Sequence, residues 1–284
     1  MGLDPYLESM PEVFLDGYRA STDGGLAAAC ACIEDYCAAI IEAVEPHVAA
    51  VKLQLACFEP YGPPGMDVFA RLCREARSRG LLVIADAKRG DIGLSAAAYS
   101  AAFLGRPGGL TGGLDGYGVD AMTVNPLFGS DGIEPFIKDC EAYGKGIFIL
   151  VKTSNPGSAE LQDLVVGDGG RMFHEHLAGL IRDWGSSLVG AGGYSSVGAV
   201  VGATHPDTIK RLREVLPKAF FLLPGYGAQG ATAADVAPAF DDKGLGALVS
   251  ASRSIIYAGD DESFATAATG AAEKMKQELW AAVR

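Results

Sequence analysis

Apolar runs alternate with longer amphipathic segments along the whole chain. Short apolar runs bounded by Gly, Pro and polar residues are typical of buried strands, whereas apolar residues that recur every three or four positions predict helices. Seven strands are predicted, at 49–57, 81–85, 119–124, 146–151, 197–202, 219–223 and 247–250. Helices are predicted at 26–44, 65–79, 95–104, 132–143, 171–184, 206–215, 231–240 and about 262–283.

Strands that alternate with helices predict βαβ units and a parallel sheet, which is an α/β fold. Residues 1–4 are expected to form the end of an eighth strand, and eight units would close a TIM (β/α)8 barrel. The length of 284 residues suits one such barrel in a single domain. The alternative is an open doubly wound sheet, which the lack of a Gly-x-Gly-x-x-Gly motif after the first strand disfavours.

Composition and charge narrow the range of partners. Hydrophobic residues make up 49% of the chain and charged residues 20%, which is typical of a globular enzyme. The net charge is −12, and no run of Lys and Arg exceeds two residues, so neither a nucleic acid nor an anionic membrane is an expected partner. Because this charge repels anions, a phosphate site would need its own local positive charge.

Six cysteines, at positions 30, 32, 37, 57, 73 and 140, show no spacing typical of metal ligands. We expect reduced and mostly buried thiols, as in a cytoplasmic protein. The sequence shows no signal peptide and no apolar run of about 18 residues that could span a bilayer.

The most informative segment is 86–93, Asp-Ala-Lys-Arg-Gly-Asp-Ile-Gly, which follows the apolar run at 81–85. Side chains alternate along a strand, so Asp86 and Lys88 are expected to point the same way. Asp91 follows on a turn that Gly90 and Gly93 make possible. Clustered charges near a core must be paired or solvated, so this segment indicates either a catalytic site or a structural ion pair.

Other predicted strands also end in polar residues. These are Asp4, Lys52 with Gln54, Thr123 with Asn125, Lys152 with Ser154, and Arg253. In a TIM barrel the carboxyl ends of the strands meet on one face, where the chemistry takes place. The pattern therefore predicts one site assembled from many strand ends.

A phosphate site is predicted after the last two strands, at Pro224-Gly225-Tyr226-Gly227-Ala228-Gln229-Gly230 and at Arg253. Glycines such as Gly225 let backbone N–H groups approach an anion, and an arginine adds charge-assisted hydrogen bonds. Gln229 is expected to donate from a loop that closes over the ligand. The alternative is an ordinary glycine turn beside a solvated arginine.

Seven segments in this order resemble the orotidine 5′-phosphate decarboxylase family, in its longer bacterial form. They are 2–5 (GLDP), 51–54 (VKLQ), 86–93 (DAKRGDIG), 123–126 (TVNP), 152–156 (KTSNP), 224–230 (PGYGAQG) and 251–253 (ASR). The resemblance implies a homodimeric TIM barrel that converts orotidine 5′-monophosphate to UMP and CO₂. It also implies that no metal or organic cofactor takes part.

The resemblance implies specific catalytic roles. Lys52, Asp86, Lys88 and Asp91 would form the alternating Lys-Asp-Lys-Asp network of the family. Lys88 would stabilise charge at C6 of the pyrimidine and deliver a proton to it. Asp91 and Ile92 would reach the active site of the other subunit, so that each dimer would hold two shared sites.

The resemblance also implies the substrate contacts. Asp4 and Lys52 would bind ribose hydroxyls, Ser154 the pyrimidine, and Gln229 with Arg253 the phosphate. Ser95 stands where the family usually has Thr, and its hydroxyl is expected to keep a ribose contact. Asn125 and Gly225 are expected to line the same site.

The start of the chain departs from the family pattern. Only three residues precede Asp4, whereas family members usually carry more chain there, so we expect a shortened first strand and a weak seam in the barrel. Two other functions remain as alternatives. Lys52 or Lys152 could form a Schiff base in an aldolase-type barrel, or the barrel could bind a nucleotide without turning it over.

The four histidines, at positions 47, 174, 176 and 205, are expected to be surface or capping residues. His174 and His176 are two apart in a predicted helix, so they cannot chelate one ion together.

Overall fold

The computed structural model describes residues 1–19, 25–110, 113–114, 116–167 and 169–284. The chain forms two compact units. Unit 1 comprises Met1–Ala87 and Ala251–Glu278, and unit 2 comprises Lys88–Ser250 and Leu279–Arg284. Strand β3 (Leu82–Arg89) and helix α11 (Phe264–Ala282) contribute to both units.

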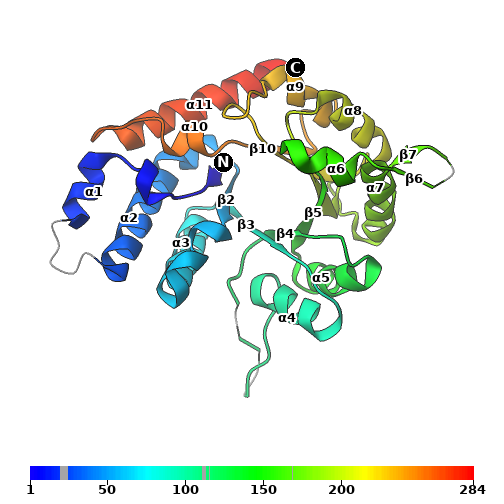
Figure 1. The fold of residues 1–284 in the computed structure, drawn as a ribbon, viewed down its shortest axis with the longest axis horizontal. Coiled ribbons are helices and arrows are strands. Elements are labelled where there is room, and N and C mark those ends of the chain that lie inside the picture. The colour runs from blue at the N-terminus through cyan, green and yellow to red at the C-terminus, as the bar shows by residue number, and fades with distance from the viewer. Residues whose placement is uncertain (20–24, 111–112, 115, 168) are drawn as a thin grey trace. The chain divides into compact units, whose positions relative to one another are not determined.

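Unit 1 is built on three parallel strands, β1 (Gly2–Leu3), β2 (Ala50–Gln54) and the first part of β3. Its helices are α1 (Glu12–Arg19), α2 (Leu26–Val44), α3 (Gly62–Ser78), the short α10 (Arg253–Ile256) and most of α11. Helices α2 and α3 lie side by side and bury apolar faces (Figure 1). The register pairs Gly2 with Lys52, and Gln54 with Asp86.

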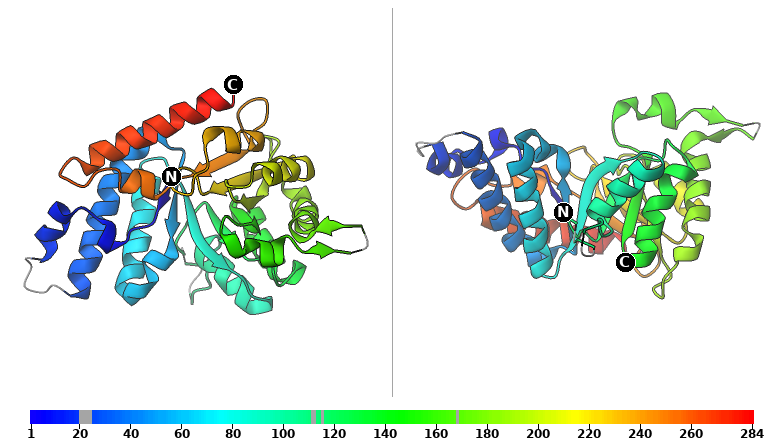
Figure 2. Two further views of the ribbon diagram at one scale, coloured as in Figure 1. Left: turned by 45° about the horizontal axis from the view of Figure 1, so that its top comes forward. Right: turned by 90° about the horizontal axis from the view of Figure 1, so that it is seen from below.

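Unit 2 holds the end of β3 and the parallel strands β4 (Ala121–Val124), β5 (Gly146–Lys152), β8 (Ser195–Val201), β9 (Ala219–Pro224) and β10 (Ala247–Ser250). Its helices are α4 (Gly93–Phe103), α5 (Ser130–Tyr143), α6 (Ala159–Gln162), α7 (Phe173–Trp184), α8 (Pro206–Val215) and α9 (Ala233–Val236). A two-stranded hairpin of β6 (Val165–Val166) and β7 (Arg171–Met172) projects beyond α7 (Figure 2).

The eight parallel strands follow the hydrogen-bonded order β1-β2-β3-β4-β5-β8-β9-β10. Neighbours in the sheet are thus neighbours in the chain, apart from the β6–β7 excursion. A doubly wound sheet would instead reverse its strand order at a switch point. The predicted α/β fold of the TIM (β/α)8 class is therefore confirmed, and so is the eighth strand at the start of the chain.

Most predicted elements agree with the structure. Helices at 26–44 and 206–215 match α2 and α8 at both ends. The strand predicted at 81–85 is longer, because β3 continues to Arg89 and so contains both Asp86 and Lys88. The helix predicted at 231–240 is only α9 followed by a 3₁₀ turn at Ala237–Ala239, which Pro238 opens.

All six cysteines are free and buried, as predicted. Burial raises the pKa of Cys32 to about 11, and also that of Cys57, where a hydrogen bond with Tyr6 partly opposes it. Both thiols are therefore poor nucleophiles near neutral pH.

Within the described part of the chain, no helix combines the length and the apolar character needed to cross a membrane.

Candidate active site

The centre of the site in unit 1 is a buried ion pair. Lys52 lies in the interior of β2, and its Nζ is 2.7 Å from Oδ2 of Asp86 on the neighbouring β3. The two side chains are only 7% and 9% exposed. Because these strands pair in parallel, a lysine and a carboxylate from segments far apart in sequence meet within the sheet.

This environment keeps Lys52 charged. Burial lowers the pKa of Lys52, but the carboxylates of Asp86 and Asp4 outweigh burial, so the pKa is raised overall. A Schiff-base lysine needs the opposite shift, because only the neutral amine attacks a carbonyl. The aldolase alternative is therefore disfavoured at Lys52.

Two further side chains complete this group. Gln54 donates from Nε2 to Oδ2 of Asp86 at 3.0 Å. Asp4, directly after β1, places its Oδ1 3.9 Å from Nζ of Lys52. That oxygen is buried without a hydrogen-bond partner, and such an atom is suited to accept a hydrogen bond from a ligand hydroxyl. Asp4 and Lys52, the two residues expected to bind ribose hydroxyls, therefore lie close together.

Arg253 is the first residue of α10, and its side chain is exposed. The preceding Ala251 accepts a hydrogen bond from the backbone N–H of Gly2 at 2.7 Å. The hydroxyl of Tyr257, at the end of α10, donates to the carbonyl of Asp4 at 2.9 Å. The segment 251–257, which contains Arg253, is thus hydrogen-bonded near both of its ends to the segment that carries Asp4.

In unit 2, Lys88 has an unusual backbone. Its φ is +47°, and it is the single non-glycine residue with a positive φ among those the structure describes. Its N–H donates to Oγ1 of Thr123 at 2.9 Å, and the next carbonyl, that of Arg89, accepts from the N–H of Asn125 at 2.8 Å. This φ departs from the extended values of a regular strand, although Lys88 still belongs to β3.

Asp91 and Ile92 follow in the turn before α4. The carboxylate of Asp91 accepts a hydrogen bond from the N–H of Ile92 at 2.8 Å, and Ile92 is 56% exposed. Ser95 lies exposed on the first turn of α4. A β-carbon on Gly90 would lie 3.1 Å from the carbonyl oxygen of Asn125, so glycine lets these two loops approach closely.

Ser154, Gly225 and Gln229 come together at the ends of β5 and β9. A β-carbon on Gly225 would lie 3.0 Å from Oε1 of Gln229 and 3.6 Å from the Cβ of Ser154. The φ of Gly225 is +106°, which disfavours any residue with a side chain. The Oδ1 of Asn125, which follows β4, accepts a hydrogen bond from the N–H of Leu127 at 3.0 Å within its own turn.

The expectation for His174 is wrong. His174 is buried in α7, and its Nδ1 lies 2.8 Å from the carbonyl oxygen of Gln162 and 3.2 Å from Oδ1 of Asp163. The same carboxylate pairs with the buried Lys152. Sequence analysis missed this cluster because periodicity does not show that α6 folds back onto the end of β5.

Searches against known proteins find close relatives over most of the chain. It is 43% identical to the orotidine 5′-phosphate decarboxylase of Caldicellulosiruptor bescii over 257 residues, covering 90% of this chain and 84% of that protein. It is also 43% identical to that of Rhodopirellula baltica over 268 residues, covering 94% and 86%. The structure of Leishmania donovani OMP decarboxylase matches with a TM-score of 0.75 and 31% identity, covering 99% of this chain and 92% of that one.

A more distant structure, the orotidine 5′-monophosphate decarboxylase of Plasmodium berghei, shares the fold with a TM-score of 0.79 at 15% identity, covering 100% of this chain and 94% of that one. The model of the orotidine 5′-phosphate decarboxylase / HUMPS family matches residues 26–268. The family model spans most of the sequence, and the two relatives named above are 43% identical over at least 90% of it, so the chain belongs to the orotidine 5′-phosphate decarboxylase / HUMPS family.

Proposed function

We propose that the chain converts orotidine 5′-monophosphate to UMP and CO₂, the last step of pyrimidine biosynthesis, and does so in the cytoplasm. The observation that carries this proposal is the buried ion pair of Lys52 and Asp86, with Lys88 two residues further along β3. Burying two charges costs desolvation free energy that only close contact and hydrogen bonds offset, so a buried pair is weak evidence for stability, and we infer that this one is retained for function. The curated relatives named above carry this activity in their names.

In the proposed mechanism, the bond between C6 and the carboxylate of the substrate breaks and its electron pair stays on C6. No ring carbonyl delocalises this vinyl carbanion well, so a cation beside C6 is the main source of stabilisation. We assign that role to the ammonium of Lys88, which would then give its proton to C6 to form UMP. Asp86 would face the departing carboxylate and hold Lys52 in place through their 2.7 Å contact.

The substrate would be held at its other groups. Asp4 and Lys52 would bind the ribose hydroxyls, which the unpartnered Oδ1 of Asp4 supports. Ser154 would contact the pyrimidine, and Gln229 with Arg253 would bind the phosphate. Binding energy from the remote phosphate then lowers the barrier at C6 when it is realised in the transition state.

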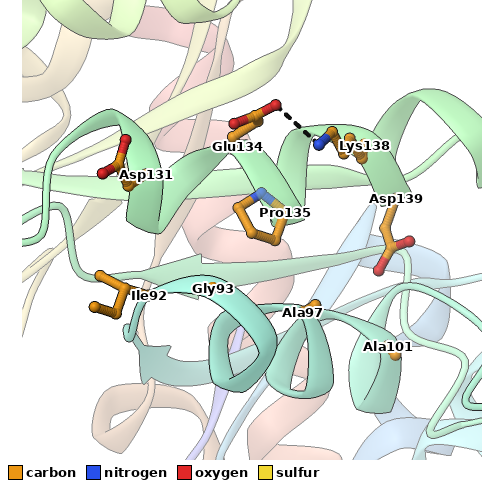
Figure 3. Close-up of a pocket in the computed structure, with 9 residues that line it drawn as sticks. All are labelled: Ile92, Gly93, Ala97, Ala101, Asp131, Glu134, Pro135, Lys138 and Asp139. Atoms are coloured by element: carbon orange, nitrogen blue, oxygen red, sulfur yellow. Dashed lines mark ion pairs between the residues drawn. The ribbon is translucent and has the colours of Figure 1, made fainter.

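We also propose a homodimer with shared sites, in which Asp91 and Ile92 reach the partner's substrate, and we propose a ribose contact for Ser95. Exposed apolar side chains near Asp91 support this: Ile92 is 56%, Leu94 91% and Leu127 77% exposed. A groove of about 700 Å³ runs between α4 and α5, with Ile92 near the start of α4 (Figure 3). The α5 side of this groove is charged, with Asp131, Glu134, Lys138 and Asp139, so the apolar contact surface is the one formed by Ile92, Leu94 and Leu127.

Decarboxylation is tested by the absorbance change of orotidine 5′-monophosphate in the presence of EDTA. The Lys88→Ala variant is expected to lower kcat by at least about 1,000-fold with an unchanged fold, because charge stabilisation and proton transfer are lost together. Lys274→Ala, at an exposed ion pair with Glu278 on α11, is the matched control and should keep full turnover. An intact protein that leaves the substrate unchanged would refute the function, and near-normal turnover by Lys88→Ala would refute the role of Lys88.

A further inference from the structure

A second buried lysine in unit 2 has no part in the proposed mechanism. Lys152 is the last residue of β5, and its side chain is 3% exposed. Its Nζ lies 2.7 Å from Oδ1 of Asp163, which directly follows α6. Because a buried ammonium without a partner is strongly unfavourable, this pair fixes the end of α6 against the end of β5.

The carboxylate of Asp163 is itself held from a second side. His174 directs Nδ1 to the carbonyl oxygen of Gln162 at 2.8 Å and to Oδ1 of Asp163 at 3.2 Å. A carbonyl oxygen can only accept, so Nδ1 carries the proton and donates. Gln162 and Asp163 are thus bound from two sides, by Lys152 at the end of β5 and by His174 of α7.

The side chain of Gln162 then binds Thr153, the residue before Ser154. Its Oε1 accepts from the N–H of Thr153 at 2.8 Å, and its Nε2 donates to Oγ1 of Thr153 at 2.9 Å. On the other side, Nε2 of His205 donates to the carbonyl of Thr153 at 3.2 Å. Both main-chain polar groups of Thr153 are therefore bound by side chains.

These contacts fix the position of Ser154. A β-carbon on Gly202 would lie 2.9 Å from both the backbone nitrogen and the Cα of Ser154, so the serine backbone packs directly on β8's end. The Cβ of Ser154 also lies 3.6 Å from the β-carbon position of Gly225. Ser154 thus packs against the end of β8 and lies close to the loop that carries Gln229.

Apolar packing alone does not hold the segment 161–165, which contains Gln162 and Asp163. Leu161, Leu164 and Val165, which surround Gln162 and Asp163 in sequence, are 68%, 52% and 65% exposed. Since little apolar surface is buried here, hydrogen bonds and the buried ion pair have to determine its geometry.

We propose that Lys152, Gln162, Asp163, His174 and His205 form a positioning network that holds Thr153 and thereby sets the orientation of Ser154 toward the pyrimidine ring. This inference rests on the proposed function, because Ser154 is the pyrimidine contact there. We expect the network to act chiefly on recognition of the base, because Ser154 is the group that it positions. It is a network of positioning residues, since none of the five is assigned a contact with the substrate.

The test uses Gln162→Ala in the full chain, because this neutral substitution leaves the buried Lys152–Asp163 pair intact. We expect kcat/KM for orotidine 5′-monophosphate to fall about 10- to 100-fold, as a misplaced contact group does. The inhibition constant of ribose 5-phosphate, which lacks the base, should stay within about 2-fold. Gln277→Ala, at a glutamine that bonds Glu273 on α11, is the control and should change neither value.

A double-mutant cycle with Ser154→Ala separates positioning from general damage. If Gln162 acts through Ser154, Gln162→Ala should have little further effect on kcat/KM in the Ser154→Ala background. Additive losses, or an equal loss of ribose 5-phosphate affinity, would overturn the inference.

One measurement needs no substrate, so it remains valid even if the unsubstituted chain fails to decarboxylate orotidine 5′-monophosphate. Amide hydrogen exchange at Thr153 should be at least about 10-fold faster in Gln162→Ala than in the unsubstituted protein, and unchanged in Gln277→Ala. Unchanged exchange at Thr153 would show that Gln162 does not hold this segment and would refute the network.

Discussion

The left-handed backbone at Lys88 is strained, and it occurs at the residue to which we assign proton transfer. Its φ of +47° costs a residue with a side chain about 1 kcal/mol or more. The hydrogen bond from its N–H to Thr123 helps to hold this conformation. Strain retained at one residue of an otherwise regular strand indicates that the backbone is shaped for the function of that residue.

Two substitutions at this position separate strain from chemistry. Both Lys88→Ala and Lys88→Gly remove the amine, but glycine adopts a positive φ without steric cost. We therefore expect Lys88→Gly to be more stable than Lys88→Ala by about 1 kcal/mol in urea unfolding. At Leu82, an exposed residue on the same strand with ordinary backbone, the order should reverse. Equal stabilities at position 88 would contradict the strain.

The ion pair of Lys152 and Asp163 should make the stability of the protein depend on pH, because the carboxyl of Asp163 titrates. The hydrogen bond from Lys152, followed by the charges of Lys152 and His174, lowers the pKa of Asp163 from its ordinary value of 3.8. With a lowered folded pKa, the contribution of this pair to stability is present above about pH 4 and is lost as the pH falls through the folded value.

Asp163→Asn should therefore be less stable than the unsubstituted protein at pH 7, and this gap should narrow as the pH falls below about 4. Urea unfolding at a series of pH values measures it. Asp183→Asn, which removes an exposed partner of Arg182, is the control and should show little effect at any pH. If the difference in free energy of unfolding between Asp163→Asn and the unsubstituted protein does not change with pH, the ionised carboxylate of Asp163 is not the source of the stabilisation.

At the scale of elements, the spacing of apolar residues predicted helix bounds correctly where one face of a long helix is buried. In α2, the buried residues Ile33, Cys37, Ile40, Ile41 and Val44 recur at helical spacing. Proline at the first position of α8 marks its start, which explains why the start of that helix could be predicted. The order of strand-end polar residues likewise predicted which side chains meet, as the pair of Lys52 and Asp86 shows.

Elements without such a pattern were missed. The hairpin of β6 and β7 has two residues in each strand, too few for an alternating pattern, and α6 has only four residues. Helix α1 was also missed, since Leu15 is its single buried residue. The positive φ of Lys88 and the ion pair of Lys152 with Asp163 depend on contacts between segments that are apart in the sequence. The local spacing of apolar and polar residues does not encode such contacts.

Arg213 links several elements of unit 2 in a way that predicts a stability effect. Its guanidinium donates to the carbonyls of Ala239, Leu216, Ala219 and Gly246 at 2.8–3.0 Å, and its Cζ lies 3.8 Å from the ring centre of Phe221. Burial lowers its pKa to about 10, so it stays charged at neutral pH.

Arg213→Lys should lower the free energy of unfolding by about 2–4 kcal/mol, because an ammonium cannot reach all four carbonyls and buried charge-assisted hydrogen bonds are lost. Urea unfolding measures this change. Arg211→Lys, at an exposed arginine on the same helix that pairs with Glu175 and Glu214, should change stability by less than about 1 kcal/mol. Similar effects at the two positions would show that the carbonyl contacts contribute little.

At the scale of the whole molecule, the proposed dimer makes each site depend on two chains. The exposed Leu94 and Leu127 flank the segment of Asp91 and Ile92. If this surface joins two copies about a two-fold axis, Lys88 of one chain and Asp91 of the other would act on the same substrate. Two inactive variants should then complement each other.

Mixing equal amounts of Lys88→Ala and Asp91→Ala, with unfolding and refolding to exchange subunits, should restore about a quarter of normal activity. Random pairing makes half of the dimers mixed, and each mixed dimer has one intact site of two. Leu94→Asp should abolish the rescue, because a charge on the apolar surface opposes association, and sedimentation should show monomers. If each chain instead formed its own site, the mixture would stay as inactive as either variant alone, so the absence of rescue in a confirmed dimer would exclude shared sites.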